Sequence, residues 1–139
     1  MPARLLDTNI LLHYLTRDDP DRAAAALALL TRVERGQERV VTSPLVIFET
    51  IFTLQKRYQF PKNEIRQVMT DLISMRGLQL PNKAQWIDAL DLFVSQNIPF
   101  VDAYNAVYMR SRGLNEIYGW DGDFDKIAGI RRVEPEAEP

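Results

Sequence analysis

The sequence contains no cysteine and only one histidine, His13. The lack of cysteine excludes disulfide bonds, zinc–thiolate sites and cysteine nucleophiles. No apolar run approaches the roughly 20 residues that are needed to span a bilayer. The N-terminal residues, 1–4, also lack the charged region, apolar stretch and cleavage site of a secretory signal. We therefore expect a cytoplasmic protein.

The chain also lacks a strong charge of either sign, since its formal net charge is −2. Nucleic-acid-binding proteins commonly carry a basic excess, so the overall charge gives no indication of such a partner. A chain of 139 residues can bury about two-thirds of the surface of its unfolded state. We expect one compact domain over residues 1–133, followed by an acidic, proline-rich tail, 134–139, that is disordered.

Short apolar segments alternate with longer segments of helical periodicity along most of the chain. The short segments predict strands near residues 5–6, 40–41, 78–80, 116–118 and 131–133. The longer segments predict helices near residues 10–15, 21–36, 44–57, 61–77, 86–94 and 102–112. This alternation is typical of the α/β class and predicts a three-layer α/β/α sandwich around a mainly parallel sheet.

Two aspartates, Asp7 and Asp121, follow predicted strands. Ligands of parallel sheets bind in the crevice outside the carboxyl ends of the strands, so both positions are candidate site residues. Aspartate is also a preferred N-cap residue of helices, and a capping role is the alternative explanation for each.

Glu49 lies within Val46–Phe52, a predicted helical segment that is apolar on nearly every side. A carboxylate is seldom buried without a partner, so we favour a metal or catalytic role over an ion pair with an arginine. Asp102 comes at the start of another predicted helix, where capping is again the alternative. Asn105 follows one turn later on the same face, where its amide can bind a metal or orient a water, and a plain polar helix residue is an equal alternative.

The densest acidic segment is Asp121–Asp125. It does not fit a calcium loop of the EF-hand type, because Lys126 stands where the sixth residue should be glycine and Arg132 where the twelfth should be glutamate. A phosphatase with an aspartyl nucleophile is disfavoured too. Such an enzyme has a second aspartate two residues after the first, and here Asp7 is followed at that distance by Asn9.

Several carboxylates that converge at one place repel each other, and a bound divalent cation relieves this repulsion. Oxygen ligands without cysteine or clustered histidine suit Mg²⁺ or Mn²⁺ rather than zinc. One or two such cations would polarise a scissile phosphate and activate a water. His13 is interpreted as a surface or interface residue.

Four segments carry a resemblance to a known family, in both their order and their spacing. They are Leu6–Leu12, Glu49 in its apolar helix, Phe100–Ala103 and Asp121–Ile127. Together they resemble the signature of VapC-type PIN-domain toxins. The resemblance places the acidic catalytic and metal-binding quartet at Asp7, Glu49, Asp102 and Asp121. It gives supporting roles to Thr8, Asn9 and Asp123.

The resemblance implies a Mg²⁺- or Mn²⁺-dependent endoribonuclease that acts as the toxin of a toxin–antitoxin pair. It further implies a homodimer that a cognate antitoxin protein inhibits. One departure is Gly119-Trp120, where the family usually has serine or threonine near the last acidic motif. The main alternative is a noncatalytic PIN-like module that binds RNA or a protein, and a metal nuclease acting on DNA is a further one.

Overall fold

A computed structural model describes residues 3–137 of the chain. The chain divides into two compact units, Met1–Lys83 and Ala84–Pro139, and each is described by itself. Within the described residues, every helix is too short or too polar to cross a membrane.

The first unit contains a three-stranded parallel sheet made of β1 (Arg4–Leu5), β2 (Val40–Val41) and β3 (Leu78–Gln79), in that spatial order. Arg4 pairs with Val40 and Val40 pairs with Leu78. Because all three strands run in the same direction, the segments that enter them share one edge of the sheet. The segments that leave them share the opposite edge, and Asp7 lies on that edge.

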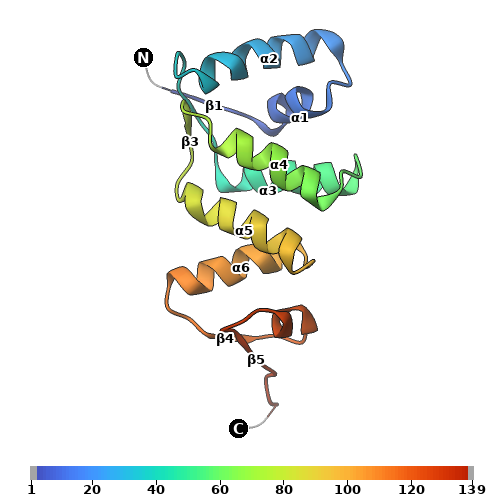
Figure 1. Cartoon of the computed structure of the whole chain (residues 1–139), viewed down its shortest axis with the longest axis vertical. Helices are drawn as coiled ribbons and strands as arrows, with labels where there is room; N and C mark the ends of the chain where they lie inside the picture. Colours follow the sequence, from blue (N-terminus) through green and yellow to red (C-terminus); the bar gives the residue numbers. More distant parts are fainter. Residues whose placement is uncertain (1–2, 138–139) are drawn as a thin grey trace. The chain divides into compact units, whose positions relative to one another are not determined.

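Four helices complete the first unit: α1 (Thr8–Thr16), α2 (Pro20–Glu34), α3 (Pro44–Lys56) and α4 (Lys62–Ile73). Side-chain caps start α2 and α3, because Asp19 accepts from the amide of Arg22 and Ser43 accepts from the amide of Val46. In Figure 1, α1 lies against α2, and contacts also join α1 to α3 and α3 to α4. The helices and strands bury aliphatic residues that include Leu11, Leu30, Ile47, Met69 and Leu78.

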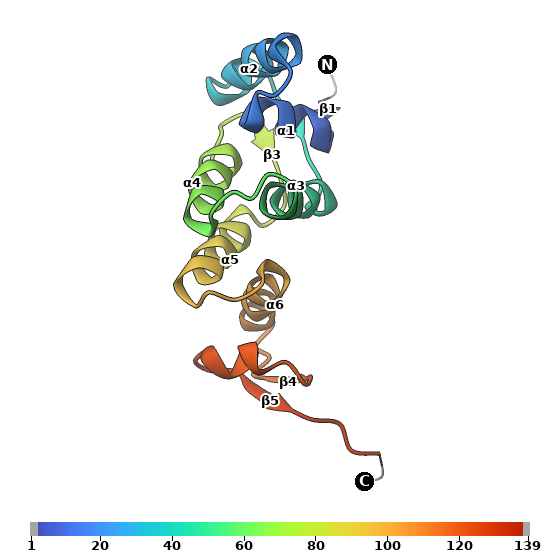
Figure 2. The same cartoon turned by 90° about the vertical axis from the view of Figure 1, so that its right-hand side faces the viewer.

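The second unit is built from α5 (Lys83–Ser95), α6 (Phe100–Ser111), β4 (Glu116–Tyr118), the short 3₁₀ helix η1 (Gly122–Lys126) and β5 (Arg131–Val133). Aromatic rings join α5 to α6: the Trp86 ring lies 4.6 Å from that of Tyr104, and the Phe93 ring meets that of Phe100 edge-on at 5.7 Å. Strands β4 and β5 pair in parallel, and Figure 2 shows η1 in the connection between them.

The α/β class and the parallel pairing predicted from the sequence are confirmed, and each predicted strand segment lies in or next to an observed strand. The predicted helix over 61–77 is shorter, since α4 ends at Ile73. The helical turn η1 was not predicted. Of the predicted tail, residues 134–137 lie outside regular secondary structure and are exposed, and residues 138–139 lie outside the described part of the chain.

Candidate functional site

Three aspartates of the second unit come together: Asp102, Asp121 and Asp123. Each offers one carboxylate oxygen, and these oxygens all lie within 4.8 Å of one another. Asp102 belongs to the first turn of α6, Asp121 follows β4, and Asp123 lies in η1. We call this group the aspartate cluster. Three segments of the second unit therefore bring carboxylates of the same charge close together.

Asp102 is half-buried, and its Oδ2 atom is buried without a hydrogen-bond partner among the described residues. Helix α6 begins at Phe100 with Pro99 at its N-cap, so the capping role considered for Asp102 is wrong. A buried carboxylate oxygen without a partner is costly in a folded protein. Such an atom beside two further carboxylates indicates a position for a positively charged ligand.

Asp121 does cap a helix: it is the N-cap of η1, and its Oδ1 accepts a 2.9 Å hydrogen bond from the amide of Asp123. Asp121 therefore both caps η1 and belongs to the aspartate cluster. Asp123 is half-buried, and its Oδ1 lies 3.2 Å from Nζ of Lys126. Lys126 is the one cation within ion-pairing distance of these three aspartates among the described residues.

The pKa of Asp102 is raised from 3.8 to about 6, and burial is the largest cause. The negative charge of Asp121, a hydrogen bond to Asp121 that a protonated carboxyl can donate, and the negative charge of Asp123 contribute to the same rise. A divalent cation would reverse these effects, because it attracts the charged form of all three groups. The donors are all carboxylate oxygens, and one of them has no other partner, so the cluster fits Mg²⁺ or Mn²⁺.

Asp7 belongs to the first unit, where it occupies the N-cap position of α1 with an exposed side chain. Its carboxylate makes no capping hydrogen bond, so the alternative explanation from the sequence does not apply. Thr8 is buried and Asn9 is exposed. The Asp7 carboxylate is therefore left available at the edge of the sheet where the strands end.

Glu49 also belongs to the first unit, and here the reasoning from the sequence was wrong. Helix α3 buries Ile47, Thr50, Ile51 and Leu54, whereas Glu49 is exposed. The helical repeat places Glu49 on the same face as Leu45 and Phe52, which are 78% and 49% exposed. Its apolar neighbours in the sequence therefore did not indicate burial. No arginine pairs with Glu49 among the described residues, so the alternative of an ion pair does not apply there either.

The cluster includes one residue for which the sequence indicated only a supporting role, Asp123. The resemblance implies a supporting role for Asp123, but one of its carboxylate oxygens lies within 4.8 Å of those of Asp102 and Asp121. The resemblance of Asp121–Ile127 to the last acidic motif of the family was the signal that pointed to it. Asn105 lies one turn after Asp102 on α6, with an exposed side chain.

His13 is half-buried near the end of α1, and its Nδ1 lies 3.6 Å from Oδ1 of Asp18.

Comparison with known proteins gives this site a context. A family model described as PIN domain matches residues 4–130. A VapC ribonuclease of Aquifex aeolicus is 22% identical over 135 residues, which cover 97% of this chain and 98% of that protein. A further match is the crystal structure of VapC20 from Mycobacterium tuberculosis, described as a toxin that cleaves the sarcin–ricin loop. Its sequence is 23% identical to this one, the match covers 96% of this chain and 100% of that chain, and the TM-score is 0.39. The match of the PIN model to most of the chain confirms the family predicted from the motifs: the chain belongs to the PIN domain family.

Proposed function

We propose that this protein is a Mg²⁺- or Mn²⁺-dependent endoribonuclease of the VapC type. The observation that carries the proposal is the aspartate cluster: three carboxylates gather with one cation beside them, and one buried oxygen lacks a partner. The similarity to a VapC ribonuclease along nearly the whole chain supports RNA as the substrate.

We assign metal binding and catalysis to the quartet Asp7, Glu49, Asp102 and Asp121. Asp123 would contribute a further carboxylate, and we expect Thr8, Asn9 and Asn105 to support the acidic residues or orient a water. A bound divalent cation supplies Lewis-acid activation of the phosphodiester and of the attacking water. We further propose that residues 1–133 act as one PIN-like nuclease domain.

The residues of the cluster set the charge of the site. Lys126 offsets part of the negative charge of Asp123, with which it pairs at 3.2 Å. Asp102 holds a proton at a higher pH than an ordinary aspartate, because its pKa is about 6. Protons and the cation therefore compete for Asp102, and we expect metal affinity and activity to fall as the pH drops through 6.

The proposal is tested by incubating the purified protein, free of any bound inhibitor, with a panel of RNAs in Mg²⁺ or Mn²⁺. We expect cleavage that stops with EDTA and falls at least about 100-fold in the variants D7N, E49Q, D102N and D121N, since each removes a carboxylate that would hold the cation. D91N is the matched control, because Asp91 is exposed on α5 outside the cluster. DNA strands of the same sequence distinguish a ribonuclease from a deoxyribonuclease.

Each outcome distinguishes the proposal from a rival. Equal cleavage in EDTA would show that the metal mechanism is wrong. Inactivity on the whole panel, together with RNA or protein binding, would favour the noncatalytic PIN-like module. Loss of activity in D102N and D121N but not in D7N and E49Q would restrict the site to the residues of the second unit.

The partners are proposed from the resemblance. We propose that the protein is the toxin of a toxin–antitoxin pair and that it forms a homodimer. Co-expression with the product of a small neighbouring reading frame should yield a complex without nuclease activity. Light scattering on the isolated protein should give twice the mass of the 139-residue chain. A monomer, or a complex that stays active, would contradict the corresponding part of this proposal.

A further inference from the structure

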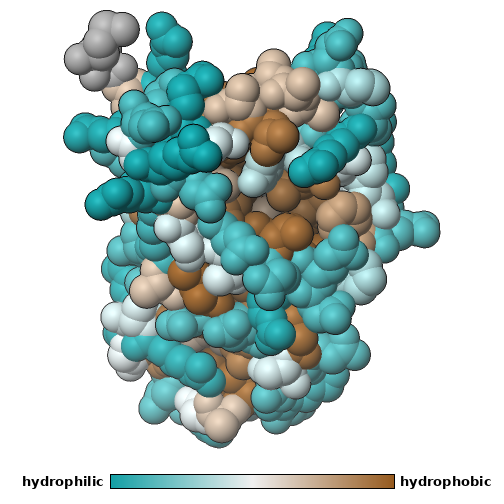
Figure 3. Space-filling model, turned by 45° about the horizontal axis from the view of Figure 1, so that its top comes forward, coloured by the Kyte–Doolittle hydropathy of each residue, from teal (hydrophilic) through white to brown (hydrophobic). Residues whose placement is uncertain are grey.

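Five arginines of the first unit gather where the chain enters the three-stranded sheet. Arg4 is the first residue of β1, Arg39 directly precedes β2, and Arg76 comes two residues before β3. The other two, Arg32 and Arg35, lie at the end of α2. We call this group the arginine edge. All five are exposed, and Figure 3 shows a hydrophilic patch close to the N-terminal end of the chain.

Hydrogen bonds connect the backbone segments that carry the arginine edge. The amide of Gly77 donates to the carbonyl of Val33 at the end of α2, and the amide of Val40 donates to the carbonyl of Gly77, at 2.9 and 2.8 Å. Gly77 approaches the turn before β2 so closely that a Cβ atom there would lie 2.1 Å from the carbonyl oxygen of Glu38. The end of α2 and the entries to β2 and β3 therefore form one fixed support.

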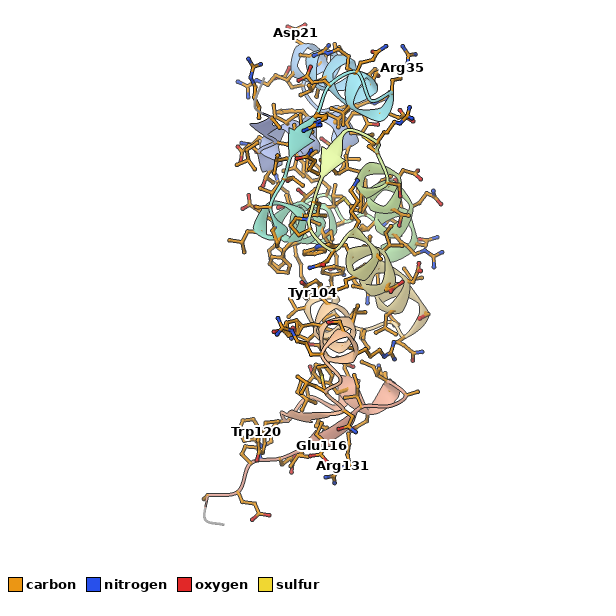
Figure 4. The ribbon with its side chains drawn as sticks, turned by 90° about the vertical axis from the view of Figure 1, so that its left-hand side faces the viewer. Asp21, Arg35, Tyr104, Glu116, Trp120 and Arg131 are labelled. Carbon is orange, nitrogen blue, oxygen red and sulfur yellow. The ribbon has the colours of Figure 1, made fainter. Side chains whose placement is uncertain are left out.

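The side chain of Arg76 packs against this support. A Cβ atom added at Gly36 would lie 2.9 Å from Cδ of Arg76, so the aliphatic part of the arginine covers the Gly36 turn. Gly36 has a φ of +74°, which favours glycine here. Figure 4 shows Arg35 projecting outward beside the same turn. The charged ends are thus presented to solvent from a rigid base.

Most of these charges lack a counter-charge. Arg32 pairs with Glu38 at 3.1 Å. In the part of the chain that the structure describes, Arg4, Arg35, Arg39 and Arg76 have no carboxylate within ion-pairing distance. On other surfaces Arg22 pairs with Asp19, Arg131 with Glu116 and Arg132 with Asp125, whereas further arginines there form no ion pair among the described residues. Even with Glu34 and Glu38 counted against the five arginines, the edge carries a net charge of +3 in a chain whose total is −2.

Helix stability explains only part of this arrangement. Cations near the C-terminus of a helix interact favourably with its dipole, and this accounts for Arg32 and Arg35 on α2. It does not account for Arg4, Arg39 and Arg76, which come from the entries to three strands. Four unpaired like charges on one surface repel each other, which favours binding of a ligand with several negative charges.

We infer that the arginine edge binds the phosphate backbone of the RNA substrate; this rests on the function proposed above. The guanidinium group binds phosphate oxygens in a bidentate manner, and arginine contacts position the backbone without reading its sequence. A carboxylate-rich catalytic site repels RNA, so cations elsewhere must supply the attraction. Arg4 and Asp7 are three residues apart along β1 and its exit, which at about 3.3 Å per residue is about 10 Å, a distance that one RNA strand can cover.

The test is the binding of a fluorescent single-stranded RNA, measured in EDTA at several salt concentrations. The variant R35Q/R39Q/R76Q removes three unpaired charges and leaves Arg4 in its strand. If each arginine neutralises one phosphate, each contributes about 0.7 to the slope of log affinity against log salt. The variant should therefore have a slope shallower by about 2 and bind about 100-fold more weakly at 0.1 M salt.

A matched control removes three positive charges from other surfaces of the same unit, in the variant R17Q/R22Q/R66Q. It should bind RNA nearly as well as the wild type. The variant R35K/R39K/R76K should keep the steep salt dependence, because the charges remain. Thermal unfolding of each variant shows whether the fold persists, and the lysine variant tests the charge even if the glutamine variant is unstable.

The outcomes separate this inference from the proposed nuclease. Equal losses in the two glutamine variants, or no loss in R35Q/R39Q/R76Q, would overturn the arginine edge as the RNA surface while EDTA-sensitive cleavage still stood. A protein that binds RNA through the edge but cleaves none would support the inference and contradict the nuclease. If the edge bound phosphatidylserine vesicles and not RNA, its partner would be a membrane surface, and the inference would be wrong.

Discussion

Replacing Asp102 by asparagine should stabilise the protein at neutral pH while removing its metal-dependent activity. In the wild type, Asp102 must be ionised at pH 7 although it is half-buried and lies beside Asp121 and Asp123. Asparagine is similar in shape and carries no charge, so D102N removes the repulsion within the cluster. The same substitution removes a ligand of the proposed cation.

The magnitude follows from the pKa of Asp102, which is about 6 in the folded protein against 3.8 for an ordinary aspartate. At 1.36 kcal/mol for a tenfold change in proton affinity, the difference corresponds to at most about 3 kcal/mol. Solvent screening at a half-exposed group reduces this to about 1–2 kcal/mol. The pKa of Asp102 is higher in the folded protein than in the unfolded chain, so protonation of Asp102 favours folding. This contribution to the free energy of unfolding is complete below pH 3.8 and is lost as the pH rises through 6.

The assay is urea unfolding in EDTA between pH 4 and pH 8, with wild type, D102N and the control D91N. D102N should exceed the wild type by about 1–2 kcal/mol at pH 7, and the gain should disappear near pH 4. D91N should follow the wild type at every pH. If D102N were less stable than the wild type at pH 7, or if its pH dependence were unchanged, the account of repulsion within the cluster would be refuted.

Three further predictions concern the metal and the packing. Mn²⁺ at 100 times its dissociation constant should stabilise the wild type by about 2.7 kcal/mol, and D121N should show no such gain in a thermal melt. F93A should cost about 3–5 kcal/mol in denaturant unfolding, because Phe93 is fully buried against Phe100. G77A should cost at least about 2 kcal/mol, since its Cβ would clash with backbone oxygens, whereas G119A enters open space and should change stability by less than about 0.5 kcal/mol.

Much of the local structure was predictable because it depends on neighbours in the sequence. Ser43-Pro44 starts α3 through a cap and a favourable first residue, and the short apolar segments became strands. The boundary of α4 was less accurate: the helix ends at Ile73 with Ser74 at its C-cap, before the glycine at position 77 that the sequence suggests as its stop. The turn η1 was missed because it follows from the cap made by Asp121, in a segment without helical periodicity.

The acidic residues were found from their order along the chain, but their environments were not. The apolar neighbours of Glu49 predict burial, whereas the structure places it on an exposed face with Leu45 and Phe52. Asp7 and Asp102 were as easily explained by capping, which neither performs. Burial depends on which helix face meets a neighbour, and capping depends on the exact residue at which a helix begins; one sequence specifies neither.

The sequence by itself determined the class of fold, the family resemblance and the preference for an oxygen-ligated cation, because these follow from residue types and spacing. The tertiary structure decided which charges meet. It brought Asp123 into the cluster on equal terms, left Oδ2 of Asp102 without a partner and raised the pKa of that residue. It also gathered arginines from five places between residues 4 and 76 at one edge of a sheet. Electrostatic interactions depend on the distance between charges and on their burial. The net charge of −2 therefore indicates neither the aspartate cluster nor the arginine edge.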